Sequence, residues 1–179
     1  MKNVLIIPTS LRPASNSHAL ALAFARGAAA AGHHVETLDL HDKRIGFCRG
    51  CMACAKSGRC VIADDAPQIV ARMHDADVIA FASPIYFYEM SGLMKTLLDR
   101  TDPLYGGDYR FRDIYLLTSA ADDAPETPAR ATAGLEGWIA CFERARLAGS
   151  VFAGGVEAAG DIANHPALET AYDMGRAID

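Results

Sequence analysis

Two hydrophobic patterns alternate along the chain. Short apolar runs are typical of strands, whereas apolar residues recurring every three or four positions are typical of amphipathic helices. The strand pattern occurs at residues 3–7, 34–40, 77–82, 113–118 and 150–156. The helix pattern occurs at residues 16–31, 65–74, 91–100, 127–146 and 166–178. The chain therefore predicts five successive strand–helix units.

The boundaries of two helical segments carry their own markers. Gly32 follows the first segment, and a glycine, which has no Cβ, suits the positive φ common at helix ends. Asp65 and Gln68 have the spacing of a capping box, which predicts that the second helix starts there.

Short connections between the predicted units favour one architecture. Strands that alternate with helices form a parallel sheet covered on both faces, and right-handed crossovers make that sheet doubly wound. Ligands bind such sheets at the carboxyl ends of the strands. The loops after the first, third and fourth strands are therefore the candidate site.

Length and composition restrict the possible functions. We expect a single domain over residues 1–179, with a cysteine-rich loop at 44–65. The net charge of −5 argues against a nucleic-acid partner, and no apolar run approaches the roughly 20 residues that span a bilayer. Five cysteines without a secretion signal indicate free thiols and a cytoplasmic protein.

The loop after the first strand has the chemistry of an anion site. It runs from Pro8 to Ser17, contains several hydroxyls and Arg12, and leads directly into a helix. Free N–H groups and the positive end of the helix dipole favour a phosphate at such a position. The loop is neither a Walker A motif nor a G-x-G-x-x-G fingerprint.

The loop after the third strand contains three consecutive aromatic residues, Tyr86, Phe87 and Tyr88. Flat side chains at the mouth of a sheet can pack against a planar ligand ring. Alternatively, this loop packs on itself or on a partner subunit. A phosphate site and a ring site at one edge together describe a nucleotide-like cofactor such as FMN.

The order and spacing of several motifs resemble the NAD(P)H-dependent FMN reductases of the flavodoxin-like superfamily. The resemblance runs through Ser10-Leu11-Arg12, Ser15-Asn16-Ser17, Ser83-Pro84-Ile85-Tyr86, Ser91-Gly92-Leu93-Met94-Lys95 and Asp99-Arg100. It continues through Gly154-Gly155-Val156, Gly160-Asp161-Ile162, His165-Pro166 and Ala171-Tyr172, and so covers essentially the whole chain. It implies a flavodoxin-like α/β fold whose five parallel strands have the order 2-1-3-4-5.

The resemblance also implies which residues bind FMN. Its phosphate would lie on Ser10, Arg12, Ser15, Asn16 and Ser17. Its ring would be lined by Pro84, Ile85, Tyr86, Phe87 and Gly92, with Thr118 and Ser119 closing the far side. NAD(P)H would donate hydride to the flavin N5, so no catalytic side chain is expected. The electrons would pass to a quinone, a free flavin or another small acceptor, in a homodimer or homotetramer.

Two departures from the family pattern concern the same loops. Thr9 stands where the family usually has glycine, which predicts a slightly wider turn. The third loop contains Asp122 and Asp123 where the family often has glycine. Two carboxylates disfavour a second phosphate nearby, which leaves the docking of a nicotinamide cofactor open.

A third motif lies after the second strand. Cys48, Cys51, Cys54 and Cys60 form a C-x2-C-x2-C-x5-C pattern, which resembles the loop that holds a [4Fe-4S] cluster in the iron–sulfur flavoproteins. Zinc, a thioredoxin-like dithiol and unliganded thiols are the alternatives. Five cations surround the cysteines with no acid between Asp42 and Asp64, and form either a solvated rim or a dock for an acidic partner.

Three functions therefore compete. The first is an FMN-dependent oxidoreductase that uses NAD(P)H. The second is an iron–sulfur flavoprotein that carries electrons between protein partners. The third is a cysteine-based redox or metal sensor that uses the fold as a scaffold.

Overall fold

The computed structural model describes all residues from 1 to 179. Five parallel strands form the sheet in the order β2–β1–β3–β5–β6. Their bounds are Asn3–Pro8 for β1, His34–Thr37 for β2, Val78–Tyr86 for β3, Asp113–Ser119 for β5 and Arg146–Ala153 for β6. A two-residue strand, β4 at Glu89–Met90, pairs antiparallel with the end of β3. Apart from this short addition, the order of the parallel strands is the predicted 2-1-3-4-5.

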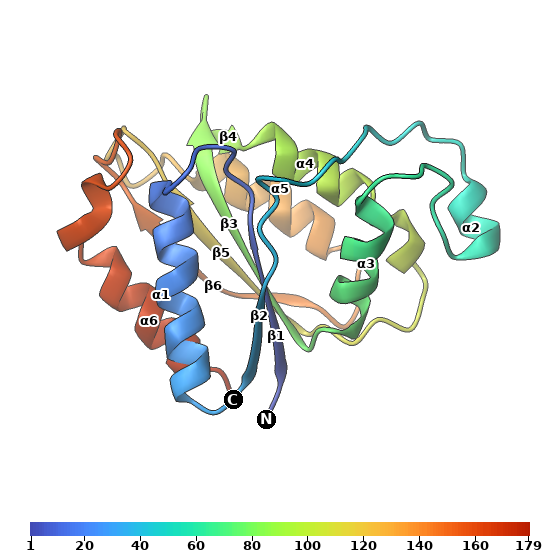
Figure 1. Ribbon diagram of the computed structural model, residues 1–179, viewed down its shortest axis with the longest axis horizontal. Helices are drawn as coiled ribbons and strands as arrows, with labels where there is room; N and C mark the ends of the chain where they lie inside the picture. The colour runs from blue at the N-terminus through green and yellow to red at the C-terminus, as the bar shows by residue number, and fades with distance from the viewer.

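Helices cover both faces of the sheet (Figure 1). α1 at Asn16–Ala30 and α6 at Ala167–Arg176 lie on one face. α3 at Ala66–Asp75, α4 at Gly92–Asp99 and α5 at Ala129–Ile139 lie on the other. A short helix, α2 at Ala53–Ser57, lies within the cysteine-rich loop, and 3₁₀ turns occupy Asp102–Leu104 and Asp161–Asn164. None of the helices is long and apolar enough to cross a membrane.

Alternate residues of the strands supply two separate cores. Val4 and Ile6 of β1 pack in the cluster that contains Phe24 of α1, whereas Leu5 and Ile7 pack in the cluster that contains Leu97 of α4. This alternation follows from the period of two along a strand. Because both faces are filled, only the two ends of the sheet remain for a ligand.

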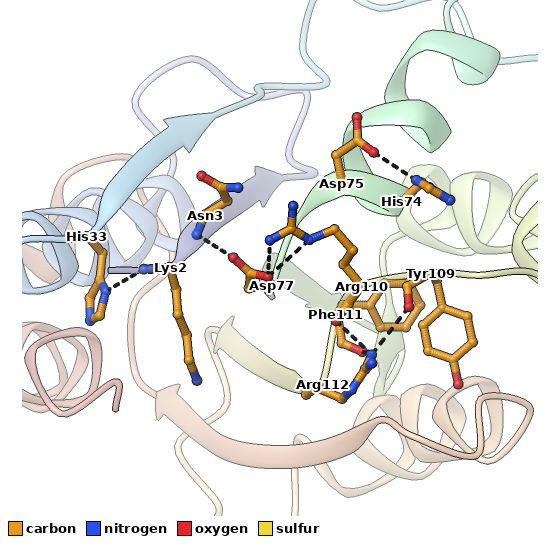
Figure 2. Close-up of polar contacts among 10 residues, drawn as sticks. All are labelled: Lys2, Asn3, His33, His74, Asp75, Asp77, Tyr109, Arg110, Phe111 and Arg112. Atoms are coloured by element: carbon orange, nitrogen blue, oxygen red, sulfur yellow. Dashed lines mark hydrogen bonds and ion pairs between the residues drawn. The ribbon is translucent and has the colours of Figure 1, made fainter.

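The amino-terminal end of the sheet is tied together by polar contacts (Figure 2). One carboxylate oxygen of Asp77 accepts a hydrogen bond from the Asn3 backbone N–H at 2.8 Å, and the other accepts from Arg110 Nη2 at 2.8 Å. Arg112 Nη1 donates to the carbonyl oxygens of Arg110 and Phe111. These bonds connect β1, β3 and the segment before β5, so this end has a structural role.

The predicted helix at 127–146 is too long. α5 ends at Ile139, the chain turns through 140–145, and β6 already begins at Arg146 rather than at residue 150. Phe142 continues the helical pattern of apolar positions, but it lies in the turn after α5 and is buried there against Phe111 and Trp138. An apolar residue can therefore continue a helical pattern while reaching the core from a turn.

α3 begins where Asp65 and Gln68 predict, with Asp65 as its N-cap, but the side-chain hydrogen bond of a capping box is absent. The Asp65 side chain makes no cap bond to the helix and instead accepts from the Arg44 backbone N–H at 2.6 Å. The neighbouring Asp64 accepts from the Ala66 N–H at 3.1 Å. The two aspartates therefore close the base of the cysteine-rich loop, a long-range role that capping patterns do not encode.

Candidate functional site

Four loops meet at the carboxyl end of the sheet and enclose a cavity of about 170 Å³. They follow β1, β3, β5 and β6. Eight of the predicted FMN-binding residues line it, namely Ser10, Arg12, Ser15, Asn16, Pro84, Ile85, Tyr86 and Ser119. The fold thus brings the predicted phosphate loop and the predicted ring loop to one place.

A buried set of hydroxyls holds the first two of these loops together. Thr9 Oγ1 lies 2.9 Å from Ser91 Oγ and donates to the Ala82 carbonyl oxygen at 3.1 Å. Ser83 Oγ accepts from the Ser91 N–H at 2.9 Å. Thr9 is only 1% exposed and has no positive φ. Its hydroxyl connects the end of β1 to Ser91, the N-cap of α4.

The start of α1 has the properties of an anion site. Ser15 is the N-cap, and its hydroxyl accepts from the His18 N–H at 3.2 Å. The backbone N–H groups of Asn16 and Ser17 have no acceptor within the protein. No acidic residue lies in the first turn of the helix, so the positive end of its dipole is uncompensated there. These donors fit an anionic oxygen group.

The loop after β6 closes one side of the cavity through Arg12 and Asn16. Arg12 Nη1 donates to the Glu157 carbonyl oxygen at 2.6 Å. Asn16 Nδ2 donates to the Ala158 carbonyl oxygen at 2.9 Å, and Asn16 Oδ1 accepts from the Gly160 N–H at 3.2 Å. The Asn16 amide therefore fastens this loop, and only its backbone N–H is free for a ligand.

The aromatic loop is the turn of a tight hairpin between β3 and β4. Tyr86 pairs with Glu89, and the two residues between them, Phe87 and Tyr88, have φ values of 51° and 66°. Positive φ at both central positions is what a two-residue hairpin requires, although Asn and Gly usually supply it. Phe87 is 96% exposed and Tyr88 is 52% exposed. The hairpin thus presents exposed aromatic side chains beside the cavity from a strained backbone.

The loop after β5 contributes the carboxylate of Asp122, whose negative charge is stabilised. Hydrogen bonds from the Thr127 hydroxyl and the Ala124 N–H lower the pKa of Asp122. Asp122 and Asp123 are both exposed, and Asp122 lies beside the Tyr88 side chain of the hairpin. The Asp122 carboxylate therefore keeps its negative charge at neutral pH, close to the cavity residues Ser119, Ala120 and Ala121.

Four predicted FMN-binding residues do not line the cavity: Ser17, Phe87, Gly92 and Thr118. Ser17 is fully buried, Thr118 donates to the Val151 carbonyl oxygen, and Phe87 projects into solvent. Conversely, the cavity is lined by Ala120, Ala121, Val156 and Glu157, which the sequence reasoning did not include. The glycines at 154, 155 and 160 marked the loop after β6, which also follows the carboxyl end of a strand.

The four clustered cysteines line a second, smaller cavity of about 130 Å³. All of them are free thiols, and Cys48 and Cys51 are exposed. No three His, Cys, Asp or Glu side chains lie close enough together to hold a single metal ion. A [4Fe-4S] cluster binds each thiolate at a different iron atom, so it does not require the sulfurs to converge on one point. The shared cavity and the four-thiol donor set therefore fit such a cluster better than zinc.

Two charged side chains from the end of α4 and the turn after it contact this cavity's cysteines. Arg100 Nη2 donates to Cys60 Sγ at 3.3 Å. Cys54 Sγ donates to Asp102 Oδ2 at 2.7 Å, and this hydrogen bond, together with burial, raises the pKa of Cys54 to about 11. Cys54 is therefore a protonated thiol at neutral pH in this structure.

The chain resembles known flavin proteins in sequence and in fold. It is 38% identical over 101 residues to an iron–sulfur flavoprotein of Methanocaldococcus jannaschii, covering 56% of this chain and 52% of that one. It is 39% identical over 82 residues to an iron–sulfur flavoprotein of Archaeoglobus fulgidus, covering 46% and 40%. Over these matches the chain spans about half or less of the relatives' length.

Solved structures agree on the fold. An NAD(P)H:quinone oxidoreductase from Methanothermobacter marburgensis superposes with a TM-score of 0.75 at 19% identity, over 99% of both chains. An azoreductase from Bacillus anthracis superposes with a TM-score of 0.74 at 19% identity, over 99% of this chain and 100% of that one. At these identities the likeness establishes a shared flavodoxin-like fold. Residues 2–158 match the NADPH-dependent FMN reductase family, and the chain therefore belongs to that family.

Proposed function

We propose that this protein is an FMN-dependent oxidoreductase that accepts hydride from NAD(P)H and passes electrons to a quinone, a flavin or another small acceptor. The observation that carries the proposal is that one cavity is lined both by Asn16, whose backbone N–H at the start of α1 has no partner, and by Pro84, Ile85 and Tyr86 at the end of β3. A negatively charged tail and a planar head are the two parts of FMN that these features suit. Family membership supports the same assignment.

The phosphate end would be bound by the first loop. The backbone N–H of Asn16 and the hydroxyl of Ser10 line the cavity as donors, the unpartnered N–H of Ser17 is next to them in the chain, and Ser15 holds the helix start in place as its N-cap. Arg12 lies at the same wall and would supply a charge-assisted hydrogen bond. These donors are preorganised because the loop is fastened to its neighbours through Thr9 and Asn16.

The ring end would lie along Pro84, Ile85 and Tyr86, opposite Ser119. The cavity volume is below the roughly 300–1,000 Å³ of sites that enclose a whole ligand. One face of the ring would therefore stay accessible at the exposed hairpin, where an electron donor or acceptor can approach. Bound FMN supplies the hydride and electron chemistry, and the chain's residues bind it, orient it and set the local charge.

The direct test is the colour and reactivity of the purified protein. We expect it to be yellow, or to bind FMN stoichiometrically on reconstitution, and to bleach when NADPH or NADH is added anaerobically. Bleached protein should recover its colour when a quinone is added. Failure to bind FMN at all, in protein with a normal circular dichroism spectrum, would refute the proposal.

A second candidate function rests on the cysteine cavity. We propose that Cys48, Cys51, Cys54 and Cys60 hold a [4Fe-4S] cluster, so that the protein carries electrons between protein partners. The shared cavity and the iron–sulfur relatives support this version. Iron and labile sulfide measured after anaerobic purification test it, and four irons per chain are expected. Fast reduction by a ferredoxin-type donor beside slow NADPH oxidation would favour the carrier over the NAD(P)H-dependent enzyme.

Assembly and compartment complete the proposal. We infer a homodimer or homotetramer, because the exposed hairpin side chains of Tyr86, Phe87 and Tyr88 form an apolar surface beside the cavity. Light scattering coupled to size-exclusion chromatography tests this, and a monomer would contradict it. Five unpaired cysteines also suit a reducing compartment such as the cytoplasm.

A further inference from the structure

Arg100, the residue after α4, has an unusual environment for an arginine. Its side chain is completely buried, and its partner Asp64 has a side chain only 11% exposed. The two form a bidentate pair, with Arg100 Nη1 at 2.6 Å and Nη2 at 3.0 Å from the two Asp64 oxygens. Burying a charged pair brings a large desolvation cost, so this arrangement depends on further hydrogen bonds.

Those further bonds join the two ends of the cysteine-rich loop. Arg100 Nη1 donates to the carbonyl oxygen of Gly46, which precedes the first cysteine, at 2.7 Å. Asp64, which follows the last cysteine, accepts a hydrogen bond at its Oδ2 from the Gly46 N–H at 2.8 Å. The ion pair therefore closes the base of the loop that carries all four clustered cysteines.

The same guanidinium touches one of the cysteines. Arg100 Nη2, which already binds Asp64, also donates to Cys60 Sγ at 3.3 Å. Cys48 and Cys51, by contrast, are exposed and form no hydrogen bond with a charged side chain. Arg100 Nε is buried and has no acceptor at all, so this group retains one N–H donor that no protein atom uses. A buried donor without a partner is costly, so the hydrogen bonds of Arg100 satisfy this buried side chain only in part.

We propose that Arg100 is a positioning residue for the cysteine site. It holds Cys60 in a fixed place in the cavity wall and donates an N–H to its sulfur, and through Gly46 and Asp64 it brings the remaining cysteines into reach. The inference rests on the cluster proposed above. Partners in the shell around metal ligands orient them, and hydrogen bonds to cluster sulfurs raise the reduction potential. A cationic donor stabilises the more negative, reduced cluster.

The test compares a double variant with the wild type. Arg100→Met with Asp64→Leu replaces the buried pair by apolar side chains, a change that is often neutral or stabilising for a fold. Arg59→Gln is the matched control, because Arg59 is an exposed arginine in the same loop whose side chain makes no hydrogen bond. Each protein is reconstituted anaerobically with iron and sulfide. Thermal unfolding and FMN content report on the fold, and iron affinity and the cluster's midpoint potential report on the site.

We expect the double variant to fold and to bind FMN like the wild type, with a somewhat lower unfolding temperature because Gly46 and Ala66 lose hydrogen-bond partners. It should bind iron about 10- to 100-fold more weakly, and its cluster should have a lower midpoint potential. The control should match the wild type. Unchanged iron affinity and potential in the folded double variant would overturn the inference. Wild type that acquires no iron would overturn both this inference and the cluster, while its FMN content still decides the oxidoreductase proposal separately.

A single variant covers the case in which the double variant does not fold. Arg100→Lys keeps the charge beside Asp64 but loses the planar fork that reaches Asp64, Gly46 and Cys60 together. We expect a folded protein whose cluster has a lower potential than that of the wild type. A lysine variant with the wild-type potential would show that the contact with Cys60 has no role, and would overturn the inference.

Discussion

The hydroxyl oxygens of Thr9 and Ser91 lie 2.9 Å apart in the interior, joining the end of β1 to the N-cap of α4. Ser91 also accepts from the Met94 N–H as the cap of α4. One buried pair therefore connects the loop proposed to bind phosphate with the helix that follows the aromatic hairpin. We expect the spacing between the two halves of the cavity to depend on this pair.

Thr9→Val should loosen this connection. Valine has nearly the same shape but leaves Ser91 without one of its partners, so we expect a loss of about 1–2 kcal/mol in unfolding free energy and weaker FMN binding. Chemical denaturation and a flavin fluorescence titration measure the two effects. Thr170→Val, on the exposed side of α6, is the control and should change neither. Wild-type FMN affinity in Thr9→Val would show that the pair does not set the cavity.

Arg12→Gln should weaken binding of the FMN phosphate without affecting binding of the flavin ring. Arg12 is exposed, so its loss should hardly affect stability, but loss of a charge-assisted bond should weaken FMN binding about 10- to 100-fold. Riboflavin, which lacks the phosphate, should bind both proteins equally. Isothermal titration with each flavin gives the comparison. Arg26→Gln, farther along α1, is the control, and an equal loss for both flavins would contradict the proposed role.

Gly27→Ala should be strongly destabilising. A Cβ at Gly27 would overlap the Tyr172 carbonyl oxygen of α6, and a Cβ at Gly175 would overlap the Phe24 carbonyl oxygen of α1. We expect a loss of about 3 kcal/mol or more, because two backbones must move apart. Gly137→Ala is the matched control: nothing lies within 4 Å of its Cβ position, so it should stabilise α5 by up to about 1 kcal/mol. Thermal unfolding measures both, and opposite signs are expected.

Phe87→Gly should relieve strain in the hairpin. A left-handed conformation costs an ordinary residue roughly 1–2 kcal/mol, and the greater entropy of glycine in the unfolded chain offsets part of that gain. We expect stability to rise by up to about 1 kcal/mol, and the KM for a quinone to rise as well if Phe87 borders the accessible ring face. Tyr105→Gly is the control, since Tyr105 is exposed with φ of −66° and should lose stability. If Phe87→Gly lost as much unfolding free energy as Tyr105→Gly, the backbone at Phe87 would not be strained.

Asp113 should make stability depend on pH in the acid range. Burial acts to raise the pKa of Asp113, but hydrogen bonds from Arg146 and Lys2 lower it by more. The unfolded chain therefore binds more protons, and the stabilisation is present above about pH 4 and is lost as the pH falls through the lowered pKa. Asp113→Asn should cost about 1–2 kcal/mol at pH 7 and flatten the stability curve below pH 4. Asp108→Asn, whose side chain is 98% exposed, should leave the curve unchanged.

Much of the fold was predictable because the spacing of apolar residues along the chain indicates which segments form strands and which form helices. The two faces of β1 and the amphipathic face of α1 follow from the positions of apolar residues, and Gly32 has the positive φ expected at a helix end. The strand order came from the resemblance to a family. The start of α3 after Asp65 was predicted correctly, but the side-chain cap of Asp65 and the end of α5 were not, because Asp65 and Phe142 make contacts with distant segments.

The candidate site divides in the same way. The meeting of the loops after the first and third strands was predictable, since parallel strands bring their carboxyl ends to one edge. The hairpin between β3 and β4, which contains the aromatic residues, was not predicted. The inclusion of Glu157 and the burial of Ser17 were not predicted either. Whether the eight lining residues touch FMN stays a prediction that the flavin titrations will decide.

The amino-acid sequence alone determined the alternation of strands and helices, the two-sided burial of the sheet and the residue types in each loop. Tertiary structure alone decided that the Asn16 amide fastens the loop after β6, and that Arg100 closes the cysteine loop while touching Cys60. The reason is physical. Local pattern depends on neighbours three or four positions away, whereas a buried polar side chain takes whichever distant partner the packed loops place beside it.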